Sequence, residues 1–162
     1  MRLYGSVNNR FEENRQYCDT IKVGTGVTEY MYSDRHPYEV TKVITQEHVF
    51  IRAMDHERID NNGMSDVQEY KYISNKNNKE LEVVKRNNRW YTVSTWDKAT
   101  MMEKAAKDTS WKTPESAYKY YLYMSGLSDK QIARLNEGKT VKKYNKINIS
   151  FGVMEEYYDF SF

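Results

Sequence analysis

Residue types that carry out catalysis or bind metals are few in this chain, and they are scattered along it. His36, His48 and His56 lie 12 and 8 positions apart, which is neither the helical i, i+4 spacing nor the short strand spacing common in metal sites. Cys18 is the only cysteine, and the sequence places no base or orienting acid beside it to activate the thiol. We therefore expect no enzymatic activity, no metal and no cofactor.

Two polar segments are candidates for binding instead of catalysis. Asp34-Arg35-His36 and the run from Arg58 to Gly63 concentrate charge between amphipathic segments, and polar loops on a rigid scaffold commonly carry binding. Two interpretations stay open: the aspartates cap their turns while the arginines pair with local acids, or the loops form an edge that binds a phosphate, a nucleotide or a protein. The candidate residues are Asp34, Arg35, His36, Arg58, Asp60, Asn61 and Asn62.

Two further segments add candidates. The C-terminal run, which contains Tyr157 and Tyr158, alternates aromatic and polar groups up to Phe162. We expect it either to complete the sheet as a last strand or to present a motif to a partner. A basic stretch over 134–146 could contact phosphate, and its candidate residues are Lys139, Lys142 and Lys143.

The elements that must position these residues are mostly strands. Runs of β-branched and aromatic residues with a period of two occupy 21–95 and 140–162, separated by turn signals at 33–37, 45–47, 60–63, 75–78 and 87–88. Short, closely spaced strands of this kind favour a small SH3-like or otherwise rolled β-barrel over a parallel α/β fold. The expected class is α+β, mainly β.

A helical insertion interrupts the strands near 97–138. The segment after Asp97 consists of good helix formers, Thr113-Pro114 predicts the start of a helix over 114–125, and Gly126 predicts its end. Ser128 and Gln131 form a capping box for a further helix. We expect a single domain over 1–162, with residues 1–20 as a polar N-terminal arm and the helices as a hairpin inserted into the β portion.

Composition limits the function classes. The 25 Lys and Arg nearly balance the 23 Asp and Glu, so neither a nucleic-acid mimic nor a generally basic coat is expected. The first residues lack the apolar run of a signal peptide, no stretch of about 18 apolar residues occurs, and a single cysteine fits a reducing compartment. We expect a cytoplasmic protein with no membrane contact.

Part of the helical region resembles a known DNA-binding motif. Residues 126–142, with Gly126, Ile132 and Val141, resemble the helix-turn-helix of LuxR-type regulators. The segment before Thr140 is about two residues too short for the turn that precedes a recognition helix, and the residues from Val141 onward alternate like a strand.

The β portion as a whole resembles a group of small uncharacterised accessory proteins from phages, prophages and plasmids of Gram-positive gut bacteria. The segments that carry the resemblance are 23–27, 32–40, 58–70, 88–90 and 151–162. The insertion at 97–138 is similar to an elaboration that shorter members lack. The resemblance implies a mobile-element protein of a bacterial cytoplasm, and it transfers no catalytic residues.

Small accessory proteins of this kind often block a host defence system, so the resemblance implies a non-catalytic inhibitor of the anti-CRISPR type. Such an inhibitor would bind a host defence protein, for example a CRISPR effector, or the complex of that protein with nucleic acid. Alternatively, it would sequester a nucleotide signal. The alternative is a nucleic-acid-binding module that uses the helical hairpin and the stretch 134–146. The oligomeric state and the target stay open.

Overall fold

Local turn chemistry fixes most strand boundaries in the computed structural model, which describes residues 20–160. A two-residue turn at 46–47 joins β2 to β3, and Asn87 and Asn88, with φ of 49° and 60°, join β6 to β7 in the left-handed conformation that such hairpins require. Both turns confirm the sequence prediction. The strands are β1 (Gly26–Tyr30), β2 (Arg35–Thr45), β3 (His48–Ala53), β4 (Asp55–Arg58), β5 (Tyr70–Ile73), β6 (Glu80–Arg86), β7 (Arg89–Trp96), β8 (Val141–Ile147) and β9 (Ile149–Gly152).

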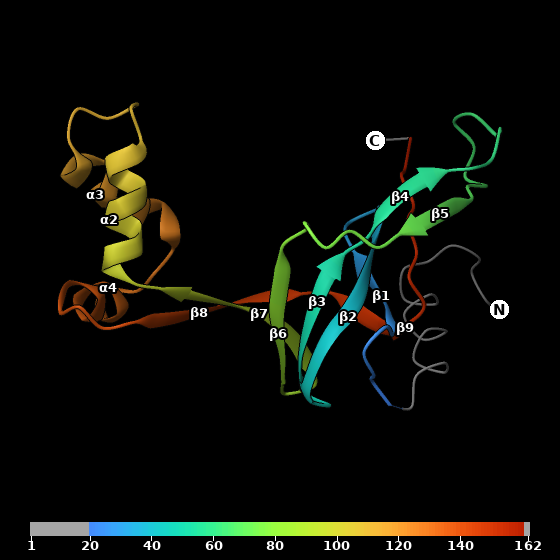
Figure 1. The fold of residues 1–162 in the computed structure, drawn as a ribbon, viewed down its shortest axis with the longest axis horizontal. Coiled ribbons are helices and arrows are strands. Elements are labelled where there is room, and N and C mark those ends of the chain that lie inside the picture. Colours follow the sequence, from blue (N-terminus) through green and yellow to red (C-terminus); the bar gives the residue numbers. More distant parts are fainter. Residues whose placement is uncertain (1–19, 161–162) are drawn as a thin grey trace. The chain divides into compact units, whose positions relative to one another are not determined.

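Seven of these strands form one sheet in the order β8-β7-β6-β3-β2-β1-β9, and β4 and β5 form a separate two-stranded sheet. The pairings β1–β2, β1–β9, β2–β3 and β3–β6 are all antiparallel (Figure 1). Residues 20–160 also form three helices, so the fold is α+β and mainly β, as expected.

The described residues form two compact units. The β unit comprises residues 20–92 and 146–160, and the helical unit comprises Val93–Asn145. The expected N-terminal arm and Cys18 lie outside the described residues.

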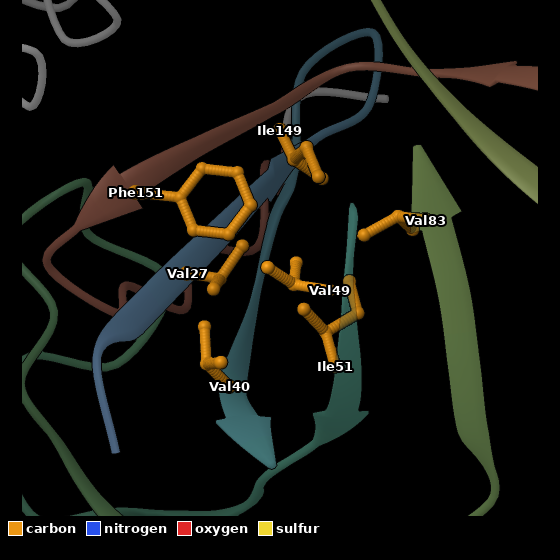
Figure 2. Close-up of a cluster of buried hydrophobic side chains, with 7 residues drawn as sticks. All are labelled: Val27, Val40, Val49, Ile51, Val83, Ile149 and Phe151. Carbon is orange, nitrogen blue, oxygen red and sulfur yellow. The ribbon is translucent and has the colours of Figure 1, made fainter. Parts of the chain in front are cut away.

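The β unit closes its core by curling the sheet. Trp90 on β7 and Phe151 on β9 are far apart in the strand order, yet their ring centroids lie 4.8 Å apart. Inside the curl lies a buried apolar cluster, drawn in Figure 2, whose side chains come from five strands and point toward one another. The cluster consists of Val27, Val40, Val49, Ile51, Val83, Ile149 and Phe151.

A glycine lets the chain after β9 cross close to β1. A Cβ at Gly26 would lie 2.7 Å from the backbone nitrogen of Met154, a distance that real Cβ atoms do not tolerate. Only glycine therefore permits this approach. The crossing leads directly into the C-terminal segment, residues 155–160.

The helices begin and end where their caps predict. Asp97 caps α2 (Lys98–Lys107), Thr113 caps α3 (Pro114–Ser125), and Ser128 with Gln131 forms the capping box of α4 (Asp129–Asn136). Gly126 ends α3 with φ of 68°. All three starts, and the end of α3, agree with the sequence prediction.

The helical unit has a core of its own. Side chains from all three helices and from β8 pack together, and the largest fully buried one is Leu135. The buried residues are Met101, Ala105, Ala117, Tyr118, Leu127, Leu135 and Val141. No helix among residues 20–160 is both long and apolar enough to pass through a bilayer.

Three details differ from the sequence prediction. Arg35 and His36 begin strand β2 rather than lying in a turn, because Pro37 fits an extended strand and extends the residue before it. Asp55–Arg58 forms a strand although every side chain in it is polar, because it pairs with β5. One interpretation expected a last strand over 157–162. Up to residue 160, this segment makes only a single bridge, between Tyr157 and Arg35, and the strand that pairs with β1 at this edge of the sheet is β9.

We predict that Ile51→Ala lowers the free energy of unfolding by about 3 kcal/mol, because the cavity left in the curled sheet cannot collapse fully. Ile44→Ala, at a site that is 48% exposed, serves as the matched control and should change it little. Urea unfolding followed by tryptophan fluorescence measures both. Equal effects of the two substitutions would contradict the assignment of the core.

Candidate functional site

The C-terminal segment is held in the β unit by Arg35. The backbone N–H of each of Arg35 and Tyr157 donates to the carbonyl oxygen of the other at 3.0 Å. The Arg35 guanidinium donates through Nη1 to Oε1 of Glu155 at 3.0 Å, and its Cζ lies 4.8 Å from the ring centre of Tyr157. The Arg35 side chain is only 7% exposed, so its charge depends on these partners.

Glu156 lies on the other side of the segment, between two histidines. Its carboxylate oxygens lie 3.1 Å from Nδ1 of His36 and 3.5 Å from Nε2 of His56, and its backbone N–H donates to the Tyr72 hydroxyl at 2.9 Å. Burial raises the pKa of Glu156 and Asp34 adds to this, while the two histidines oppose the rise. The segment therefore contacts β2, β4 and β5 at once.

The loop between β4 and β5 is organised by Asp60. Its carboxylate accepts two hydrogen bonds from Arg58, at 2.8 and 2.9 Å, and one each from the backbone N–H groups of Asn62 and Glu69, both at 2.8 Å. These four donors, led by the Arg58 guanidinium, hold the pKa of Asp60 far below its usual range. Asp60 and Arg58 thus have structural partners, as the first of the two interpretations expected.

The same loop is tied to the C-terminal segment. The Gln68 side-chain amide donates to the carbonyl of Tyr158 at 2.7 Å and accepts from its N–H at 3.1 Å, and the Tyr157 hydroxyl donates to Asp66 at 2.8 Å. Burial and the hydrogen bond to Asp66 raise the pKa of Tyr157 to about 12. From the β1–β2 turn, Asp34 accepts the N–H of Asp159 at 2.8 Å.

Apolar side chains remain exposed on the segments that these contacts hold. Tyr32 is 88% exposed in the β1–β2 turn, Met64 is 73% exposed in the β4–β5 loop, and Tyr158 is 47% exposed in the C-terminal segment. We call this set the tail-anchored surface. Its members are Met31, Tyr32, Ile59, Met64, Val67 and Tyr158.

The candidate lysines lie in the helical unit, and two of them have partners there. Lys139 pairs with Glu137 at 2.7 Å, and the ammonium of Lys143 donates to the carbonyl of Ser125. Lys142 is exposed. The residues after α4 form β8, as the alternation predicted.

The structure therefore groups the candidates into two sets. Those of the β unit meet at the C-terminal segment, which Figure 1 draws in red beside β4 and β5, and Asn61 is exposed in the same β4–β5 loop. The set is Asp34, Arg35, His36, Arg58, Asp60, Asn61, Asn62, Tyr157 and Tyr158. Sequence reasoning missed Glu155, Glu156, His56 and Gln68, although two acids beside the aromatic run could have been matched with Arg35 and His36.

Among the described residues, no group of three or more histidine, cysteine, aspartate or glutamate side chains is arranged to hold a metal ion. The charged groups that do gather at the C-terminal segment bind one another. Their arrangement positions backbone and loops.

Comparison with known proteins finds no matching family model, no matching curated protein and no matching solved structure.

We predict that Glu156→Gln changes how stability depends on pH. The pKa of Glu156 is raised in the folded state, so the protonated carboxyl group stabilises the fold. This stabilisation is complete below the ordinary glutamate pKa of about 4.3 and is lost as the pH rises through the pKa that Glu156 has in the folded state. The free energy of unfolding of the wild type, minus that of the variant, should therefore fall between pH 4 and pH 8. Urea unfolding across this range measures it.

Glu82→Gln is the matched control, because Glu82 also contacts a histidine, His48 at 2.7 Å, but is less buried. A difference between wild type and Glu156→Gln that stays constant or grows with pH would contradict the assigned burial.

Proposed function

We propose that this protein acts by binding another protein through the tail-anchored surface, without catalysis. The observation that carries the proposal is the exposure of Tyr32, Met64 and Tyr158 on three segments that hydrogen bonds hold together. Exposed tyrosine and methionine on a pre-organised scaffold are typical of protein interfaces, because little entropy is lost on binding.

Charge supports a protein partner for this surface. The helical unit holds 10 of the 25 basic and 6 of the 23 acidic residues, a net charge of +4, which leaves 15 basic and 17 acidic residues, or −2, for the rest of the sequence. Arg35 and Arg58, which a nucleotide signal would need for its phosphates, are occupied by Glu155 and Asp60. Both facts disfavour a polyanionic or nucleotide ligand here.

The resemblance to mobile-element accessory proteins supplies the partner class. In this proposal, the protein works in the cytoplasm of a bacterial host, where it occludes a host defence protein such as a CRISPR effector. The SH3-like description of the curled sheet belongs to the same proposal, and the antiparallel curl closed by Trp90 and Phe151 supports it.

Nucleic-acid binding by the helical unit is a second candidate function, and the net charge of +4 favours it. The stretch 134–146 has fewer lysines free to contact phosphate than the sequence suggests, because Lys139 and Lys143 have partners within the fold. A salt titration separates the two functions, since phosphate contacts weaken steeply with salt and protein contacts need not.

We predict that Met64→Asp abolishes capture of the host partner. A charge placed in an apolar contact should weaken binding by at least about 30-fold, the loss typical of a hot-spot residue. The measurement is a nuclease-treated pull-down from host cells, followed by titration of the recovered protein against each variant. Tyr32→Ala should weaken the same interaction.

Ile44→Asp is the control, because Ile44 is exposed near the β2–β3 turn and lies outside the tail-anchored surface. Thermal unfolding should show that all three variants remain folded. Equal recovery of the partner by wild type, Met64→Asp and Tyr32→Ala would rule out this surface.

A further inference from the structure

Helix α3 presents apolar side chains on two faces. Ala117, Tyr118 and Leu122 pack in the core of the helical unit. On the opposite face, Tyr120 and Tyr123 are 42% and 82% exposed, and Met124 beside them is also exposed. A surface helix normally has one apolar face, so the second face indicates a contact surface.

The exposed rings on this face are arranged in a row. Trp111, which precedes the helix, packs on Tyr120 with ring centroids 4.9 Å apart and an interplanar angle of 35°. Tyr123 follows Tyr120 by three residues, a spacing that puts both on the same side of the helix. We call Trp111, Tyr120 and Tyr123 the aromatic row.

Positive charge borders the aromatic row. Lys112 follows Trp111, and Lys119 precedes Tyr123 by one helical turn. Both lysines are exposed, and the ion pairs found within residues 20–160 include neither of them.

The acids of the helical unit are largely occupied. Asp97 caps α2, and Asp108 accepts a hydrogen bond from the hydroxyl of Tyr121. Glu103 pairs with Lys107, and Glu137 pairs with Lys139. Glu115 lies in the first turn of α3, where the helix dipole stabilises it. Glu115 precedes Lys119 by one helical turn, and the helical unit as a whole keeps a net charge of +4.

From this combination we propose that the aromatic row binds single-stranded nucleic acid. Bases stack on exposed aromatic rings with little sequence preference, and flanking lysines contact the phosphates. A duplex keeps its base faces stacked inside, so it cannot use the rings. The inference is independent of the protein-binding surface of the β unit, and it gives the nucleic-acid alternative a face and a ligand class.

The test is fluorescence anisotropy of labelled dT15 and U15 with the full chain at about 50 mM salt, where phosphate contacts are strong. Tyr123→Ala should weaken binding about tenfold or more, the value of one lost base stack. Lys112→Gln combined with Lys119→Gln should reduce the slope of log K against log salt by about 1.4, since each single-strand phosphate contact contributes about 0.7. A duplex of the same length should bind more weakly.

Tyr32→Ala is the matched control, because Tyr32 is as exposed as Tyr123 but belongs to the β unit. It should leave oligonucleotide binding unchanged, while Tyr123→Ala should leave capture of the protein partner unchanged. The two proposals can therefore fail separately.

Three results would overturn the inference: no binding of either oligonucleotide at low salt, equal binding by wild type and Tyr123→Ala, or tighter binding of the duplex. The oligomeric state of wild type and Tyr123→Ala, measured by sedimentation without nucleic acid, provides one more test that could overturn it. If the wild type were a dimer that Tyr123→Ala converts to monomer, and neither bound the oligonucleotides, the row would be a contact between copies of the chain.

Discussion

The buried guanidinium of Arg35 is the constraint on which the β unit depends. A cation with a side chain that is 7% exposed must be paired, and removing one partner of such a pair costs about 3–5 kcal/mol. Glu155 and the ring of Tyr157 supply the partners, and the backbone bridge between Arg35 and Tyr157 fixes their register. The C-terminal segment is therefore part of the fold, although it adds only one bridge to the sheet.

Fixing this segment also fixes the surface around it. Glu156 then reaches β2 through His36 and β4 through His56, and Tyr157 and Tyr158 hold the loop that Asp60 organises. Arg35, Glu156 and Asp60 are used in these contacts, whereas Tyr32, Met64 and Tyr158 stay exposed. Exposed aromatic and apolar side chains on fixed segments are suited to binding a protein.

Local signals predicted the helices and turns well because their causes lie within a few residues. The capping box at Ser128, the proline after Thr113 and the Asn87-Asn88 turn each act within about four positions. The site depends on contacts between distant residues, since Arg35 and Glu155 are 120 positions apart. Opposite charges suggest such pairs in one sequence, but many acids could match each arginine, and an all-polar strand such as Asp55–Arg58 lacks the alternation that reveals strands.

Hydrogen exchange of backbone amides tests the central role of Arg35 most directly. In the wild type, the amides of Tyr157 and Asp159 should be protected, because Arg35 and Asp34 accept their hydrogen bonds. In Arg35→Ala, protection should be lost at these amides and at Glu69 in the β4–β5 loop, while the amides of β3 stay protected. Unprotected Tyr157 and Asp159 amides in the wild type, or unchanged protection in Arg35→Ala, would contradict this account.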